Sequence, residues 1–151
     1  MTEPVRLNSQ TPSFNLPLLF AGQAQKEFFI NRAFAQIDAL MTGTIEGVYA
    51  NPPENPIEGD TYIVAAEAQA EWQGYESHIA IRIADSWQLV PPRSGMLVFD
   101  KTAGCIRIFR ETWSDPTAIS SPAGGTTQDV EARAAIEEIL ASLRKAGILT
   151  A

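Results

Sequence analysis

The sequence has a single cysteine, Cys105, and a single histidine, His78, among its 151 residues. One cysteine excludes an intrachain disulfide, so packing or assembly must hold the fold together. Because Cys105 lies in an alternating apolar run, we predict a buried small side chain there and no nucleophile. One histidine leaves a Ser-His-Asp triad as the only conventional His-based option, and no Gly-x-Ser-x-Gly signature accompanies it. We therefore expect no metal, no cofactor and no catalytic histidine.

Positive charge is also scarce, with 11 Lys and Arg against 18 Asp and Glu and a net charge of −7. Nucleic-acid binders usually present a basic face to the phosphates, and here the cations are scattered. No apolar run approaches the roughly 18 residues that a membrane span requires, and residues 1–15 do not resemble a signal peptide. We expect no nucleic-acid partner, no membrane insertion and no cleaved leader.

One long amphipathic segment, at 21–41, stands out in the first two thirds of the chain. Read at helical spacing, it carries a broad apolar stripe typical of a helix that faces a core. The stripe consists of Phe29, Ile30, Ala33, Phe34, Ile37, Leu40 and Met41. We predict a helix that forms the floor of the fold, with Gln25 and Lys26 at its polar start as interface or capping residues.

After this helix come short apolar runs at spacings of roughly ten residues, with Gly, Pro and Asx turn signals between them. The runs cover 45–49, 61–65, 78–83, 87–90, 96–99 and 105–109. This pattern predicts an antiparallel meander that rests one face on the helix and leaves the other face in water.

Both ends of the chain are predicted to be appendages. Residues 1–20 contain three prolines, which favour an extended arm. Apolar side chains that would dock this arm on a core or on a neighbouring subunit are Phe14, Leu16, Leu18, Leu19 and Phe20. The Pro- and Gly-containing stretch 114–127 is typical of a flexible linker, and it precedes a helix within 128–151.

That terminal helix has good start and stop signals, with Thr127 as N-cap, acidic residues first, Arg144 and Lys145 last, and then Gly147. Its apolar residues form a coiled-coil-like seam of about two heptads. The proposed oligomer contacts are Ala132, Ile136, Ile139, Leu140 and Leu143. So short a helix needs a partner, either its own sheet or other copies. Because the linker separates it from the sheet, we favour copies, with a trimer as the first expectation.

Two groups of residues invite a sharper functional interpretation. Glu58 and Asp60 could be paired carboxylates of a glycoside hydrolase, but Glu-Gly-Asp before a strand is ordinary turn chemistry, which we favour. Trp87 and Trp113 follow turns and are predicted to cap the core. Trp72 and Tyr75, in the polar loop 67–76, are the candidates for contact with a glycan.

Several segments resemble a phage-associated family of unknown function that occurs in alphaproteobacterial prophages and gene transfer agents. The similar segments are Leu16-Pro17-Leu18, the Ala21-Gly22-Gln23-Ala24-Gln25-Lys26 motif, 57–65, 72–74 and 95–99, within residues 14–113. Separately, 129–149 looks like the short terminal helix of phage fibre and head-decoration proteins. The resemblance implies a component of a phage-like particle: a head spike, a fibre or its base.

Taken together, the sequence predicts an α+β fold with an extended arm at 1–20, a helix-and-meander domain at 21–113, a linker at 114–127 and an oligomerisation helix at 128–151. The expected function is structural and not enzymatic. The expected partners are copies of itself, as a trimer or a larger ring, and capsid, tail or fibre subunits. Cytoplasmic assembly in a bacterium followed by release with the particle is the expected localisation. The alternatives are a carbohydrate-binding module for cell-surface polysaccharide and, less favoured, a small glycan hydrolase.

Overall fold

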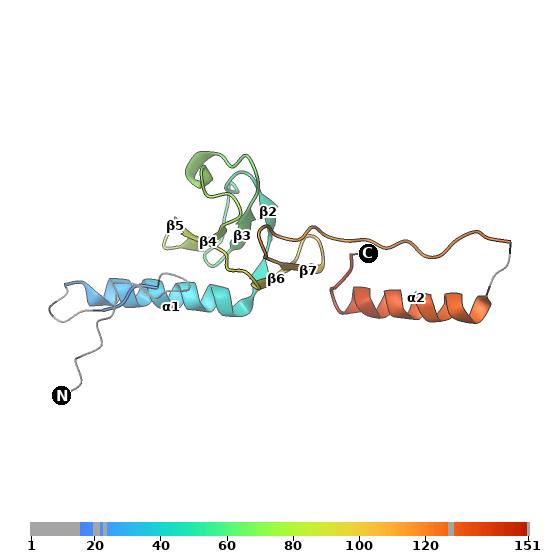
Figure 1. The fold of residues 1–151 in the computed structure, drawn as a ribbon. Coiled ribbons are helices and arrows are strands. Elements are labelled where there is room, and N and C mark those ends of the chain that lie inside the picture. Colours follow the sequence, from blue (N-terminus) through green and yellow to red (C-terminus); the bar gives the residue numbers. More distant parts are fainter. Residues whose placement is uncertain (1–15, 20–21, 23, 127–128, 151) are drawn as a thin grey trace, which may run out of the picture.

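The computed structural model describes residues 16–19, 22, 24–126 and 129–150 and has mixed α+β content. Two helices, α1 (Lys26–Thr42) and α2 (Val130–Lys145), flank a small β domain, which confirms the predicted fold class (Figure 1). The elements between the helices are β1 (Thr44–Ile45), β2 (Gly47–Tyr49), β3 (Thr61–Val64), the 3-10 turn η1 (Ala70–Trp72), β4 (Ile79–Ile83), β5 (Ser86–Val90), β6 (Leu97–Asp100) and β7 (Cys105–Ile108).

The strands form two sheets, in the orders β1-β6-β7 and β2-β3-β4-β5. The β3–β4, β4–β5 and β6–β7 pairs are antiparallel, as predicted, but β1–β6 and β2–β3 are parallel. The expected single strand at 45–49 is in fact divided at Glu46, whose amide donates to Thr61 O while Ile45 O accepts from Lys101 N. The segment thus crosses from one sheet to the other, and a single antiparallel meander is wrong for this reason.

Strand alternation creates two apolar cores. The first core, on the α1 side of the larger sheet, consists of Ala39, Ile45, Ile63, Ile79, Ile81, Val90 and Val98. The second core, on the opposite face, consists of Tyr62, Val64, Ala68, Trp72 and Ala80. Residues of the loop after β3 and of η1 thus cover the face that was expected to stay in water. All four residues of β3 are buried, as befits a strand with a core on each side.

The stripe predicted on α1 is only partly covered. The buried residues of α1 are Gln36 and Ala39, with Leu40 packed against the first core. Phe34 and Met41 remain 64% and 80% exposed. The contact between α1 and the sheet is thus narrower than the apolar stripe of the helix. The prediction that the whole stripe faces the core is therefore wrong.

The helix ends show which capping predictions hold. Gln25 precedes α1 in the left-handed region and makes no side-chain capping bond, so its predicted capping role is wrong. Asp129 caps α2, because its Oδ1 accepts from Ala132 N at 2.8 Å; the predicted cap, Thr127, lies outside the described residues. Gly147 follows α2 with φ +70°, and its amide donates to Arg144 O, as the sequence predicted.

Candidate functional site

The most prominent feature outside the β domain is an arm made of α2 and of the extended segment 114–126 beside it. Figure 1 shows this segment following the length of the helix. Two arginines of α2 bind its carbonyl groups: Arg133 donates to Pro122 O and Gly124 O, and Arg144 donates to Ile119 O. The Ser121 hydroxyl donates to the Glu137 carboxylate at 2.9 Å. The predicted linker therefore forms part of one unit with α2.

The arm is fixed to the β domain at the C-terminal end of α2. Gly147 O accepts from Ile106 N of β7 at 2.6 Å, and within the arm Thr150 N donates to Thr117 O at 2.9 Å. A Cβ at Gly147 would lie 3.1 Å from the Phe99 ring, so the turn after α2 lies close against β6. The expectation that the linker frees the helix from the sheet is therefore wrong.

The seam predicted on α2 is mostly open. Ala132 is exposed, Ile136 and Ile139 are 42% and 58% exposed, and Leu143 is half-buried. Leu140, by contrast, is 5% exposed within the single chain, which removes it from the predicted oligomer contacts. The physical reason is its helical phase: Arg133, Glu137, Leu140 and Arg144 share the side of α2 that faces segment 114–126. In the following, "seam" denotes Ala132, Ile136, Ile139 and Leu143.

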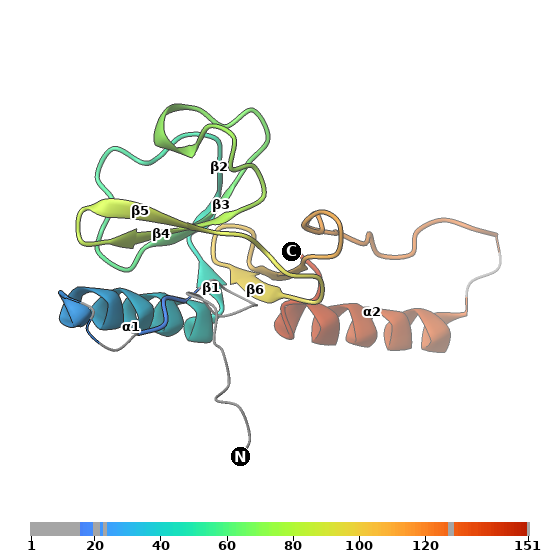
Figure 2. The same ribbon diagram turned by 60° about the vertical axis from the view of Figure 1, so that its left-hand side comes forward.

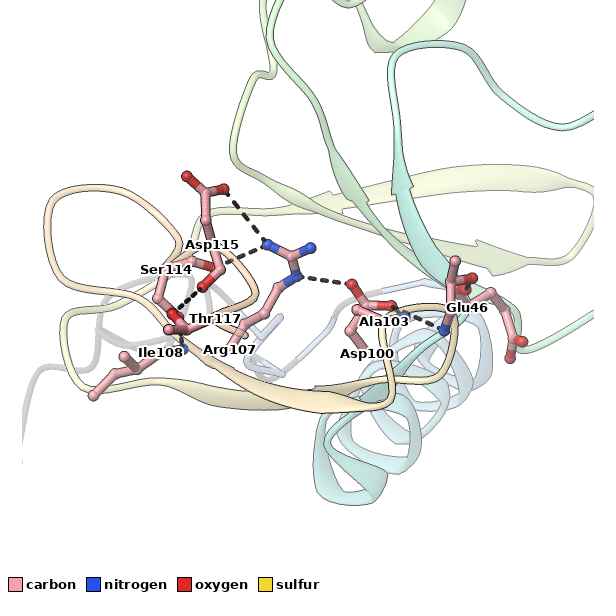
Figure 3. A network of polar contacts seen from close by, with 9 residues as sticks. Glu46, Asp100, Ala103, Arg107, Ile108, Ser114, Asp115 and Thr117 are labelled. Atoms are coloured by element: carbon pink, nitrogen blue, oxygen red, sulfur yellow. Dashed lines mark hydrogen bonds and ion pairs between the residues drawn. The ribbon is translucent and has the colours of Figure 1, made fainter. Parts of the chain in front are cut away.

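A polar network joins the arm to the β6–β7 hairpin (Figure 3). Asp100 Oδ1 accepts from the amides of Thr102 and Ala103, and its Oδ2 accepts from Arg107 Nε at 2.8 Å. The Arg107 guanidinium also donates to Ser114 O at 2.8 Å. The network thus connects the hairpin turn to the first residue of segment 114–126.

The positions of the aromatic residues contradict one part of the glycan hypothesis. Trp72 is completely buried, and its ring packs against Tyr62 and Trp87. A buried ring offers no face to a sugar, so glycan contact by Trp72 is contradicted. Tyr75 is 44% exposed and meets His78 edge to face. Trp87 and Trp113 pack against the two cores, as predicted.

The Glu58-Gly59-Asp60 segment is a turn, which confirms the favoured interpretation. Asp60 Oδ2 accepts from Ile57 N at 2.9 Å, and Gly59 has φ +88°. The Glu58 carboxylate accepts from Ala84 N in the β4–β5 turn. Both carboxylates thus accept hydrogen bonds from backbone amides, Asp60 within its own turn and Glu58 in the β4–β5 turn. His78 Nδ1 lies 3.2 Å from Glu76 O.

A crevice of about 440 Å³ separates the N-terminal half of α1 from the β4–β5 hairpin. Its size suits a small ligand, but the Arg32 guanidinium donates to Gln88 Oε1 across the opening. The polar groups best suited to hold a ligand there are thus bonded to each other or, at Glu58, to the backbone. We assign no ligand to this crevice.

Three further predictions concern the N-terminal segment 1–20, metals and membranes. Leu16 and Leu18 are half-buried and Leu19 is 41% exposed, whereas Phe14 and Phe20 lie outside the described residues. Among the residues that the structure describes, no group of three or more His, Cys, Asp and Glu side chains could hold a metal ion. Within the same residues, neither helix is long and apolar enough to cross a membrane.

The exposed apolar surfaces are the features that sequence reasoning missed. Besides Phe34 and Met41 on α1, the outer side of β6 and β7 leaves Leu97, Phe99 and Ile106 exposed. Their alternation with polar and buried residues was visible in the sequence. Such alternation predicts one solvent-facing side of the sheet, but the side chains on that side are apolar.

Comparison with known proteins places the chain in a family and gives no further identity. No curated protein matches it. The family described as "Protein of unknown function (DUF2793)" matches residues 30–114, more than half of the chain. The match covers the helix α1 from its second turn and the whole β domain, and it ends where the arm begins. The chain therefore belongs to the DUF2793 family of proteins of unknown function.

Proposed function

We propose that this chain is a structural, non-enzymatic subunit of a phage-like particle, such as a head spike, a fibre or the base of one. The single observation that carries the assembly role is the open seam on an arm that projects from the β domain (Figure 1). The phage-like setting is supported by the resemblance of residues 14–113 and 129–149 to phage and gene-transfer-agent proteins. Release with the particle follows from that setting.

The seam has the pattern of a self-associating helix. Ala132, Ile136, Ile139 and Leu143 follow one another at spacings of four, three and four. In heptad terms Ile136 and Leu143 occupy a positions, while Ile139 occupies a d position. Ile at d disfavours a two-stranded parallel coil and favours three or more strands. This supports a trimer, and a ring of higher order is the alternative if the subunit forms the base of an appendage.

An arm that is hydrogen-bonded to the β domain suits a particle component. Because α2 is bonded both to segment 114–126 and to β7, the seam has a defined direction relative to the β domain. Copies held together through the seam would present their β domains in fixed positions. In this proposal Leu16, Leu18 and Leu19 of the N-terminal segment contact capsid, tail or fibre subunits.

The non-enzymatic role is supported by the bonding of the two candidate carboxylates. Glu58 and Asp60 accept hydrogen bonds from backbone amides of their own and the adjoining turn. A glycan turnover assay with Glu58→Gln tests this directly. Turnover by the wild-type protein that Glu58→Gln abolishes would overturn the non-enzymatic proposal.

Sedimentation velocity of the intact chain tests the seam. The wild type should be trimeric, and Ile136→Glu/Ile139→Glu should be monomeric with an unchanged circular dichroism spectrum. Val130→Glu is a matched control, because Val130 is 68% exposed on the same helix but lies off the seam. A wild type that is monomeric both with and without residues 128–151 would refute self-assembly.

The particle itself provides the second test. Mass spectrometry of purified particles released by a bacterium that carries this gene should detect the chain in stoichiometric amounts. Its consistent absence from particles that contain their capsid and tail proteins would overturn the proposed location.

A contact with cell-surface polysaccharide is a second candidate, now restricted to Tyr75. The specific observation is the 44% exposure of this ring beside His78. Exposed aromatic faces suit the apolar faces of sugar rings. Binding on a glycan array that Tyr75→Ala removes would support this role, and no binding by the trimeric wild type would refute it.

A further inference from the structure

The smaller sheet, β1-β6-β7, is unusual because its solvent-exposed face is apolar. On the outer face, Leu97, Phe99 and Ile106 are 56%, 38% and 40% exposed. The inner face instead carries Val98, Cys105 and the ion pair of Asp100 with Arg107, all buried. A soluble sheet normally turns its polar face to water. Exposed apolar side chains that gather on one face mark an interaction surface.

This outer face continues into the turn that ends the arm. Ile106 N donates to Gly147 O, and a Cβ on Gly147 would lie 3.1 Å from the Phe99 ring. The next residue, Ile148, is 54% exposed. We use "sheet face" for Leu97, Phe99, Ile106 and Ile148. Figure 2 shows β6 beside the C-terminal end of α2, where the arm joins the β domain. The sheet face thus adjoins the C-terminal end of the helix that carries the seam.

We infer that the sheet face is the second part of the self-association surface, and that a second copy of this chain covers it. This inference rests on the proposed self-assembly through the seam. It adds that the assembled copies touch through their β domains as well as through their arms, so that the β domains are not free to splay apart.

The length of α2 is the first argument for a second copy as the occupant. The helix has 16 residues, or about 24 Å at 1.5 Å per residue. Isolated helices shorter than about 12–15 residues are marginal in water, and α2 is only slightly longer. Stable interfaces bury about 800 Å² on each partner. A seam of four side chains, one of them an alanine, needs additional apolar contact from an adjoining surface, and the sheet face is the nearest one.

The attachment of the arm to the β domain is the second argument. Because the turn after α2 is bonded to β7 through Gly147, copies that meet through their seams also bring their sheet faces near one another. The four members of the sheet face are uncharged and apolar, so copies of it can pack against one another without burying an unpaired charge.

Sedimentation equilibrium of Leu97→Thr/Ile106→Thr tests the inference. Threonine suits a strand and removes apolar surface; it keeps the β-branching of Ile106 and introduces β-branching at Leu97. We expect association at least tenfold weaker than in the wild type, with an unchanged unfolding temperature at concentrations where both proteins are monomeric. Ile57→Thr is the matched control, since Ile57 is 72% exposed in the connector before β3, away from the sheet face. It should associate like the wild type.

Thiol labelling provides a measurement that does not depend on weakening the assembly. Cys105 is buried, so a Leu97→Cys chain has one accessible thiol. Maleimide labelling of Leu97→Cys should slow at least tenfold as the protein concentration rises through the assembly range. An Ile57→Cys chain should label at one rate throughout.

The outcomes separate this inference from the proposed function. If Ile136→Glu/Ile139→Glu dissociates the assembly but the sheet-face variant and Leu97→Cys labelling do not respond, the inference is overturned and assembly through the seam stands. The sheet face would then belong to a different protein or to no partner. A wild type that stays monomeric overturns both.

Discussion

Asp100 and Arg107 face each other across the β6–β7 hairpin, with 2.8 Å between the carboxylate Oδ2 and the guanidinium Nε. Their side chains are 1% and 10% exposed. Removing one partner of a buried pair leaves a charge without compensation. We expect Arg107→Ala to lower the free energy of unfolding by about 3–5 kcal/mol, measured by urea denaturation.

The exposed pair of Lys101 and Glu46 is the matched control for that experiment. Its side chains are 50% and 36% exposed, so solvent screens the interaction. Lys101→Ala should cost no more than about 1 kcal/mol. Equal losses for Arg107→Ala and Lys101→Ala would contradict the structural importance of the buried network.

Trp72 is predicted to be a folding residue. Its ring is fully buried in the second core. Trp72→Ala should therefore cost about 3–5 kcal/mol of stability, whereas Tyr75→Ala, at an exposed position, should cost much less. Thermal unfolding of the two variants checks this. A Trp72→Ala protein as stable as the wild type would mean that the ring is not buried.

Tyr62 should make stability depend on pH in alkaline solution. Burial, together with the nearby Asp60 carboxylate and its hydrogen bond, raises the pKa of Tyr62 to about 12. Since the phenol ionises more easily in the unfolded chain, its contribution is complete below about pH 10 and is lost as the pH rises towards about 12. Tyr62→Phe should flatten the fall in unfolding free energy across this interval. An identical slope in both proteins would contradict this assignment.

Cys105 should react slowly with thiol reagents. Burial raises the pKa of the Cys105 thiol, and the side chain is 1% exposed. Both effects lower the accessible thiolate. We expect labelling of the native protein at neutral pH to be at least tenfold slower than labelling in urea. Equal rates would show that the β6–β7 hairpin opens readily.

Gly147 should be intolerant of a side chain. An L-residue pays about 1–2 kcal/mol in the left-handed region, and a Cβ here would also meet the Phe99 ring at 3.1 Å. Gly59→Ala is the control, because Gly59 also has positive φ but no atom within 4 Å of a Cβ. Denaturation should show a larger loss for Gly147→Ala. Equal losses would mean that the contact with Phe99 contributes nothing.

Local features of this protein follow from the sequence by itself. The helical conformation of α1, the short apolar runs, the turn at Glu58-Gly59-Asp60, the stop at Gly147 and the burial of Cys105 agree with the predictions. Each depends on neighbours within a few residues, where periodicity, turn chemistry and backbone preference act directly.

Tertiary structure alone decided which surfaces meet. Periodicity shows that a side of α1 or α2 is apolar, but not which part of that side another segment covers. On α1 Met41 is left exposed by the sheet, and on α2 Leu140 is buried on the side that faces segment 114–126. Division of 44–49 between two sheets depends on bonds to Thr61 and Lys101, far along the chain. The arm is likewise fixed by long-range bonds, from Arg144 to Ile119 and from Ile106 to Gly147. Such pairings depend on the closure of long loops, which no local pattern in the sequence encodes.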